Sequence, residues 1–154
     1  MRQISFWPGL ALVILLLGAG VRADDSIAVS DAWMREMPPV VPNAALYMTV
    51  TNSGSQPRRV LALEADWARA LEIHESRQVD GMWQMQPLEA LDIGPGEQQL
   101  LAPGGVHIMV FGVHDMPRAG DRVSVRLLLD QGQTLEVEIE VRTGGGSPHS
   151  HQHH

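Results

Sequence analysis

The sequence predicts an all-β fold, an antiparallel two-sheet sandwich with Greek-key connections. Short runs rich in Val, Ile, Leu and Thr recur about every ten residues and are separated by Gly, Pro, Asn and Asp, a spacing typical of β-sandwiches. No run shows a convincing helical period, although residues 66–71 are compatible with one turn of helix. We therefore expect roughly nine strands in one domain that spans residues 24–143.

The clearest predicted strand covers residues 134–141, where four apolar residues alternate with three glutamates. Such alternation buries one face of a strand and leaves the other in water. The run 122–129 precedes it, and the two are expected to pair through residues 130–133, where Gly132 provides the positive φ of a tight turn. The other predicted strands cover residues 27–34, 44–51, 59–63, 71–76, 82–86, 98–101 and 106–113.

The composition of the chain excludes several classes of function. Its 154 residues include 18 acidic residues and 11 basic residues, all of them Arg, for a net charge of −7, which argues against a nucleic-acid partner. The absence of cysteine excludes disulfides, zinc fingers, thiolate iron–sulfur sites, thiol nucleophiles, Cys-ligated blue-copper centres and a lipoprotein anchor. The remaining soft or borderline metal ligands are eight methionines and seven histidines.

Residues 1–23 have the order of a secretory signal peptide. Arg2 is followed by an apolar run over residues 10–17 and by small residues that end at Ala23, after which we expect cleavage. The alternative is an uncleaved anchor, but the run is shorter than the ~20 residues of a spanning helix. We therefore expect an exported domain with no membrane span, and export without disulfides suggests a bacterial periplasm.

The last eleven residues, 144–154, form a separate tail by composition. A Gly-rich linker leads to four histidines within six residues: His149, His151, His153 and His154. Neutral imidazoles at this density bind metal ions, so the tail is predicted to capture a metal that the sequence does not identify. The alternatives are a solvated tail or an expression tag.

A second group of ligand residues lies inside the domain. His107 and Met109 are two residues apart on a predicted strand and therefore project from the same face. The runs that contain His74 and Met85 flank the turn signal Asp80-Gly81, so a hairpin would let both side chains approach that strand. Two imidazoles and two thioethers form a soft, neutral site that suits Cu(I). Alternatively, these histidines are surface residues and these methionines fill the core.

The spacing of the four residues resembles a known motif. Ten residues separate His74 from Met85, twenty-one separate Met85 from His107, and one separates His107 from Met109. This spacing matches the His-x10-Met-x21-His-x-Met pattern of the PCuAC family of periplasmic copper chaperones. The residues around Ala32-Trp33, the run 44–52 and the segments 80–89 and 103–109 are also similar to blocks of that family. The resemblance covers roughly residues 27–142.

The resemblance implies a cupredoxin-like β-sandwich that binds Cu(I) through His74, Met85, His107 and Met109. It also implies copper delivery to cytochrome c oxidase, particularly to the dinuclear centre of subunit II, often alongside Sco-type proteins. The tail resembles the extensions that add a copper site in some members, here for Cu(II) or Cu(I). We expect ligand exchange rather than enzyme catalysis, and a monomer.

The chain departs from the family pattern in one respect. Many members carry extra methionines between the first His and the first ligand Met, where this chain has Ser76, Gln78 and Trp83. Trp83 shares a strand face with Met85. It either shields the ion through a cation–π or sulfur–aromatic contact or serves in ordinary packing.

Three other functions stay open at this point. The first is general binding or tolerance of periplasmic copper. The second is a zinc enzyme built on His74, Glu75, His107 and His114, although the chain has no His-Glu-x-x-His motif. The third is a structural or adhesive sandwich in which the His and Met residues have no metal role.

Overall fold

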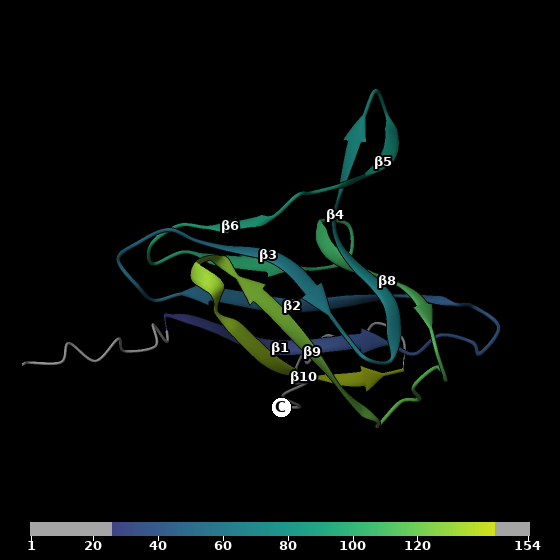
Figure 1. Cartoon of the computed structure of the whole chain (residues 1–154). Coiled ribbons are helices and arrows are strands. Elements are labelled where there is room, and N and C mark those ends of the chain that lie inside the picture. The colour runs from purple at the N-terminus through teal and green to yellow at the C-terminus, as the bar shows by residue number, and fades with distance from the viewer. Residues whose placement is uncertain (1–25, 144–154) are drawn as a thin grey trace, which may run out of the picture.

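The computed structural model describes residues 26–143, so the predicted signal peptide and the His-rich tail lie outside the described residues. Within this range the chain forms ten strands and one short 3-10 helix (Figure 1). Their bounds are β1 Ile27–Arg35, β2 Asn43–Asn52, β3 Arg58–Glu64, β4 Ala68–Val79, β5 Met82–Pro87, β6 Leu91–Ile93, β7 Gln98–Leu101, β8 Val106–Val113, β9 Arg122–Leu129, η1 Asp130–Gly132 and β10 Thr134–Arg142.

The strands form one hydrogen-bonded sheet in the order β5-β4-β8-β2-β1-β10-β9-β3-β6, with β7 also paired to β2. The sheet closes on itself because Leu63 of β3 pairs with Leu71 of β4. Many neighbours are distant in sequence, as crossover connections require. The all-β sandwich predicted from the sequence is confirmed, with one difference: the β1–β10 pair is parallel, whereas every other pair is antiparallel.

The core lies between the inward faces of these strands. Every second residue of β2, β9 and β10 is buried or half-buried, as expected for strands with one face on the core and one toward solvent. Residues from five strands meet there with almost no exposed surface: Met34, Leu46, Ile108, Val125 and Ile139. The side chains on the opposite, outward faces are therefore free to serve other roles.

The predicted hairpin between β4 and β5 is present. Asp80 and Gly81 both have positive φ, 51° and 79°, which is the geometry of the two-residue hairpin turn that Asp-Gly favours. All six residues of β5 are exposed, and the hairpin projects from the body of the sandwich (Figure 1). The strand therefore pairs with the sheet along one edge only, next to β4.

Three local details differ from the expectations or refine them. Residues 66–71, which are compatible with one turn of helix, do not form one: Asp66 and Trp67 form a turn and β4 begins at Ala68. Strand β6 was not predicted, since its three residues are too short to show a period. The tight turn between β9 and β10 has positive φ at both Gln131 and Gly132.

Candidate metal centre

His74 and His107 lie directly opposite each other in the antiparallel pair β4–β8. Their neighbours Ile73 and Ile108 point into the core, so both imidazoles project from the outward face. The ring centroids are 6.3 Å apart. Despite its outward position, His107 is only 5% exposed, and the side chain of His74 is 12% exposed.

The hydrogen bonds of the two rings fix which nitrogen carries the proton. Nδ1 of His107 donates to the carbonyl oxygen of Gly105 at 2.9 Å, so its lone pair is on Nε2. Nε2 of His74 donates to a carboxylate oxygen of Glu72 at 2.9 Å, so its lone pair is on Nδ1. Metal-binding histidines typically make such a bond with the nitrogen that does not face the metal.

The Nδ1 atom of His74 is buried and has no hydrogen-bond partner among the described residues. Burying a polar atom without a partner costs about 1–3 kcal/mol, and native proteins rarely do so without a reason. A soft metal ion bound to this lone pair would satisfy it. The same ring is held by Glu72, so the nitrogen is already oriented for a ligand.

The two predicted methionine ligands lie on the same face as the histidines. Met109 is two residues beyond His107 and sits between Glu72 of β4 and Ala45 of β2. Met85 lies opposite Ser76 on the projecting hairpin, which places it diagonally from His74. Diagonal neighbours in a sheet are within reach of long side chains. Met109 is half-buried, whereas Met85 is 52% exposed.

Trp83 lies farther out on the hairpin. It pairs with Gln78, four residues beyond His74 on β4, or about 13 Å along the strand. The indole shares a face with Met85 and is 68% exposed. The structure therefore places Trp83 beside Met85 but not beside the two imidazoles.

Two residues of this face were missed by the sequence reasoning. Glu72 holds the ring of His74, and the ring of Phe111 lies 6.1 Å from that of His74. Both were accessible in principle, because Glu72 is two residues before His74 and Phe111 is two after Met109, hence on the same strand faces. Together they give the site one charged and one apolar border.

The zinc centre considered for His74, Glu75, His107 and His114 is not assembled. Glu75 projects from the opposite face of β4 and bonds Arg77 at 2.7 Å, and His114 follows the end of β8. Within residues 26–143, no three His, Cys, Asp or Glu residues form a group that could hold a metal ion. The candidate site is of a different kind, because it combines two histidines with two methionines.

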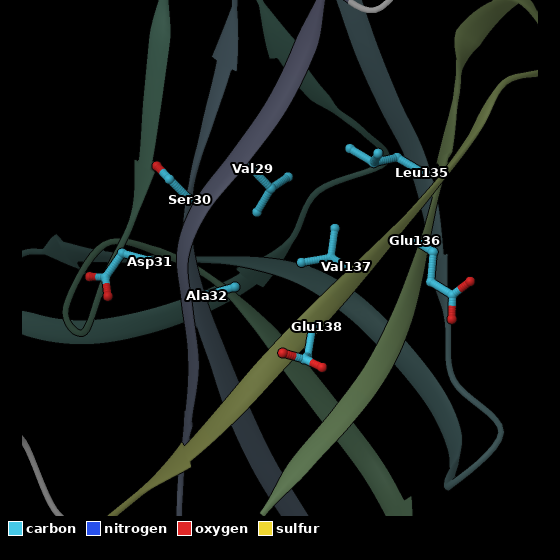
Figure 2. Close-up of a pocket in the computed structure, with 8 residues that line it drawn as sticks. All are labelled: Val29, Ser30, Asp31, Ala32, Leu135, Glu136, Val137 and Glu138. Atoms are coloured by element: carbon cyan, nitrogen blue, oxygen red, sulfur yellow. The ribbon is translucent and has the colours of Figure 1, made fainter.

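A separate cavity of about 250 Å³ lies where β1 and β10 diverge beyond their three paired positions. Figure 2 shows Val29 and Val137 pointing into the space between the two strands. Its lining contains no His or Met side chain. This cavity therefore has none of the donors that the soft site combines.

The fold and the outward pair of largely covered imidazoles define a small β-sandwich domain with a candidate metal centre. The chain belongs to the family of putative LpqE-like lipoproteins, whose model matches residues 27–141. It is 32% identical over 124 residues to a putative lipoprotein of Leifsonia xyli subsp. xyli, a match that covers 80% of this chain and 74% of the relative.

Solved structures share the fold. The copper-bound PCuAC domain from PmoF2 is 21% identical with a TM-score of 0.67, over 79% of this chain and 96% of that one. The solution structure of CuI-DR1885 from Deinococcus radiodurans is 24% identical with a TM-score of 0.59, over 82% of this chain and 84% of that one. The sandwich is therefore of the PCuAC type. Within residues 26–143, no helix is long and apolar enough to cross a membrane.

Proposed function

We propose that this protein is an exported copper chaperone that binds Cu(I) through His74, Met85, His107 and Met109. The observation that carries the proposal is the buried, unpartnered Nδ1 of His74, which lies opposite the imidazole of His107. The other nitrogen of the His74 ring is held by Glu72, and Nδ1 of His107 is held by the carbonyl of Gly105. The resemblance of the fold to domains solved with copper supports the choice of metal. The donors are neutral, and thioethers favour the soft cuprous ion.

The exposure of the site suits transfer rather than storage. His107 is buried and His74 is mostly covered, but Met85 is on a projecting hairpin that an acceptor can approach. An acceptor ligand can then replace one thioether at a time, with a shared-ligand intermediate and no catalysis. The chain has no thiol, so a cysteine-containing acceptor in a disulfide form needs a separate reductant.

The finer part of the proposal concerns location and acceptor. We place the mature protein in the periplasm after cleavage at Ala23, and the putative lipoprotein relatives support export. The proposed acceptors are the dinuclear copper centre of cytochrome c oxidase subunit II and Sco-type copper proteins. The tail residues His149, His151, His153 and His154 serve as an auxiliary site that captures Cu(II) or Cu(I) near the domain.

An anaerobic Cu(I) competition titration with bicinchoninate tests the core site. The parent is the full chain with the four tail histidines replaced by serine, which isolates the domain. We expect one tight Cu(I) per chain and an affinity at least about tenfold lower in the Met85→Ala, Met109→Ala double variant. An unchanged affinity in the double variant would contradict the four-ligand site. Equal Cu(II) uptake with and without the tail histidines would remove the role of the tail.

A further inference from the structure

A second cavity, of about 340 Å³, lies beside Met109 on the outward face of β2 and β8. Its lining includes two methionines, Met37 and Met109, from different parts of the chain. Met109 is one of the four proposed copper ligands, whereas Met37 lies in the loop between β1 and β2 and is outside the four-residue motif. The cavity therefore adjoins the proposed copper site and adds one thioether to it.

The space beside Met109 follows from the strand register. Ala45 is directly opposite Met109 in the β2–β8 pair, and its methyl group fills little of the outward face. Tyr47 lies two residues farther along the same face and forms part of the wall. A larger side chain at position 45 would cover the thioether of Met109, so the small residue keeps it accessible.

The loop that carries Met37 is held over this face. The N–H of Val41 donates to the carbonyl of Pro38 at 2.9 Å, and the N–H of Val113 donates to the carbonyl of Pro42 at 2.9 Å. Each proline fixes its own φ near −65° and reduces the freedom of the loop. Met37 is half-buried and packs against the core, so its position is set before any ligand arrives.

The rim of the cavity carries a positive charge. Burial raises the pKa of Tyr47, and the nearby Arg35 guanidinium opposes that shift, so the charge of Arg35 is felt at the cavity wall. Arg35 itself is exposed and lines the cavity. A cationic rim attracts an anionic ligand atom such as a cysteine thiolate.

We propose that Met37 and Met109 form a second, transient Cu(I) position, from which copper leaves for a thiolate acceptor that enters past Arg35. This inference rests on the proposed function. In the first step a bond forms between Cu(I) and Sδ of Met37 while a bond to one imidazole nitrogen breaks. In the second step a thiolate sulfur bonds Cu(I) as its bonds to the three thioethers and to the remaining imidazole nitrogen break. Copper stays in the cuprous state, and no proton or electron is transferred.

The position is tested by NMR on the full chain labelled with [¹³C-methyl]methionine and titrated with Cu(I) without oxygen. We expect the methyl signals of Met85, Met109 and Met37 to shift, while those of buried Met48 and exposed Met82 stay in place. Shifts of Met85 and Met109 without Met37 would overturn the second position and leave the proposed function standing. If neither Met85 nor Met109 shifts, the proposed function itself fails.

A kinetic experiment separates coordination by Met37 from mere proximity. Cu(I)-loaded full chain is mixed with excess glutathione, and the rise of the Cu(I)–thiolate absorption is followed by stopped flow. We expect Met37→Leu to slow transfer about tenfold, or about 1.4 kcal/mol of activation free energy. Its equilibrium Cu(I) affinity should change less than about twofold. The control Met82→Leu removes an exposed thioether outside the cavity and should change neither quantity.

The Arg35→Gln variant tests the thiolate step. We expect it to slow transfer to glutathione about threefold and to leave the equilibrium affinity for Cu(I) unchanged. A transfer rate equal to that of the parent in Met37→Leu would overturn the role of Met37. An equal rate in Arg35→Gln would overturn the route past the cationic rim.

Discussion

Two outward faces of the same sandwich use the same strand pattern in different ways. We call five charged residues on the outward side of β9 and β10 the charged face: Arg122, Arg126, Glu136, Glu138 and Glu140. We call Glu72, His74, His107 and Met109 the ligand face. In β8 and β10 the residues that alternate with these are mostly apolar and buried or half-buried, so the inward pattern does not distinguish the two faces.

The two faces differ in how their polar groups are satisfied. On the charged face the side chains are exposed or half-exposed, and several form ion pairs, as in the contact of 2.5 Å between Arg122 and Glu138. Such surface pairs contribute about 0–1 kcal/mol each. On the ligand face His107 is buried, His74 is mostly covered, and one nitrogen of His74 has no partner among the described residues. The difference indicates that the charged face serves solubility and that the ligand face is built for an external ligand.

Removal of both imidazoles should produce the largest difference in Cu(I) affinity between variants of the two faces. We expect His74→Ala with His107→Ala to lower Cu(I) affinity by more than about 100-fold, because both anchored nitrogen donors are lost. Glu138→Ala on the charged face should leave the affinity unchanged. Both affinities are measured by anaerobic competition in the tail-substituted chain. An equal loss of Cu(I) affinity in the two variants would show that the ligand face is not specialised for copper.

Cu(I) should also raise the stability of the folded domain. An ion bound to the native state at 100 times its Kd adds about 2.7 kcal/mol to the free energy of unfolding. We expect a matching rise in Tm for the tail-substituted parent and no rise for the His74→Ala, His107→Ala variant, measured by calorimetry without oxygen. A Tm insensitive to Cu(I) in the parent would contradict binding at the ligand face.

Glu72 should have a smaller, indirect effect. Its carboxylate accepts the N–H of His74 and thereby orients Nδ1 toward the ligand, a role that typically changes metal affinity about tenfold or more. We expect Glu72→Gln to lower Cu(I) affinity about tenfold. The matched control Glu75→Gln alters a carboxylate on the opposite face that bonds Arg77, and it should have no effect. Similar affinities in the two variants would show that Glu72 does not position the ring.

The fold was largely predictable because its determinants are local. Alternation over residues 134–141 and the Asp80-Gly81 turn each depend on a few adjacent residues, and both structures formed as expected. Contacts between distant segments were not predictable in the same way. Buried Arg58 bonds Asp130 across 72 residues of sequence, and the parallel β1–β10 pair joins the two ends of the domain.

In the candidate site, too, the features set by adjacent residues were predictable and the contacts between distant strands were not. The strand period predicted that His107 and Met109 share a face, and the hairpin signal brought Met85 near β4. The placement of His74 opposite His107 depends on the β4–β8 register, which no local pattern specifies. The cavity beside Met109 also depends on the register, because Ala45 faces Met109 only when β2 and β8 pair in this alignment.

The smallest expected effect concerns an exposed ion pair beside the charged face. The hydrogen bond and charge of Arg126 hold the pKa of Asp66 below its ordinary value. Since the folded-state pKa is the lower one, the pair stabilises the fold above the unfolded value of about 4, and this contribution is lost as pH falls through the folded-state pKa. We expect Asp66→Asn to lower the urea midpoint slightly at pH 7 and not at pH 2, with unchanged Cu(I) affinity at pH 7.

In an Arg126→Gln background the effect of Asp66→Asn on the urea midpoint should lose most of its pH dependence, because the partner that lowers the pKa of Asp66 is absent. A change in Cu(I) affinity would mean that the two faces are coupled.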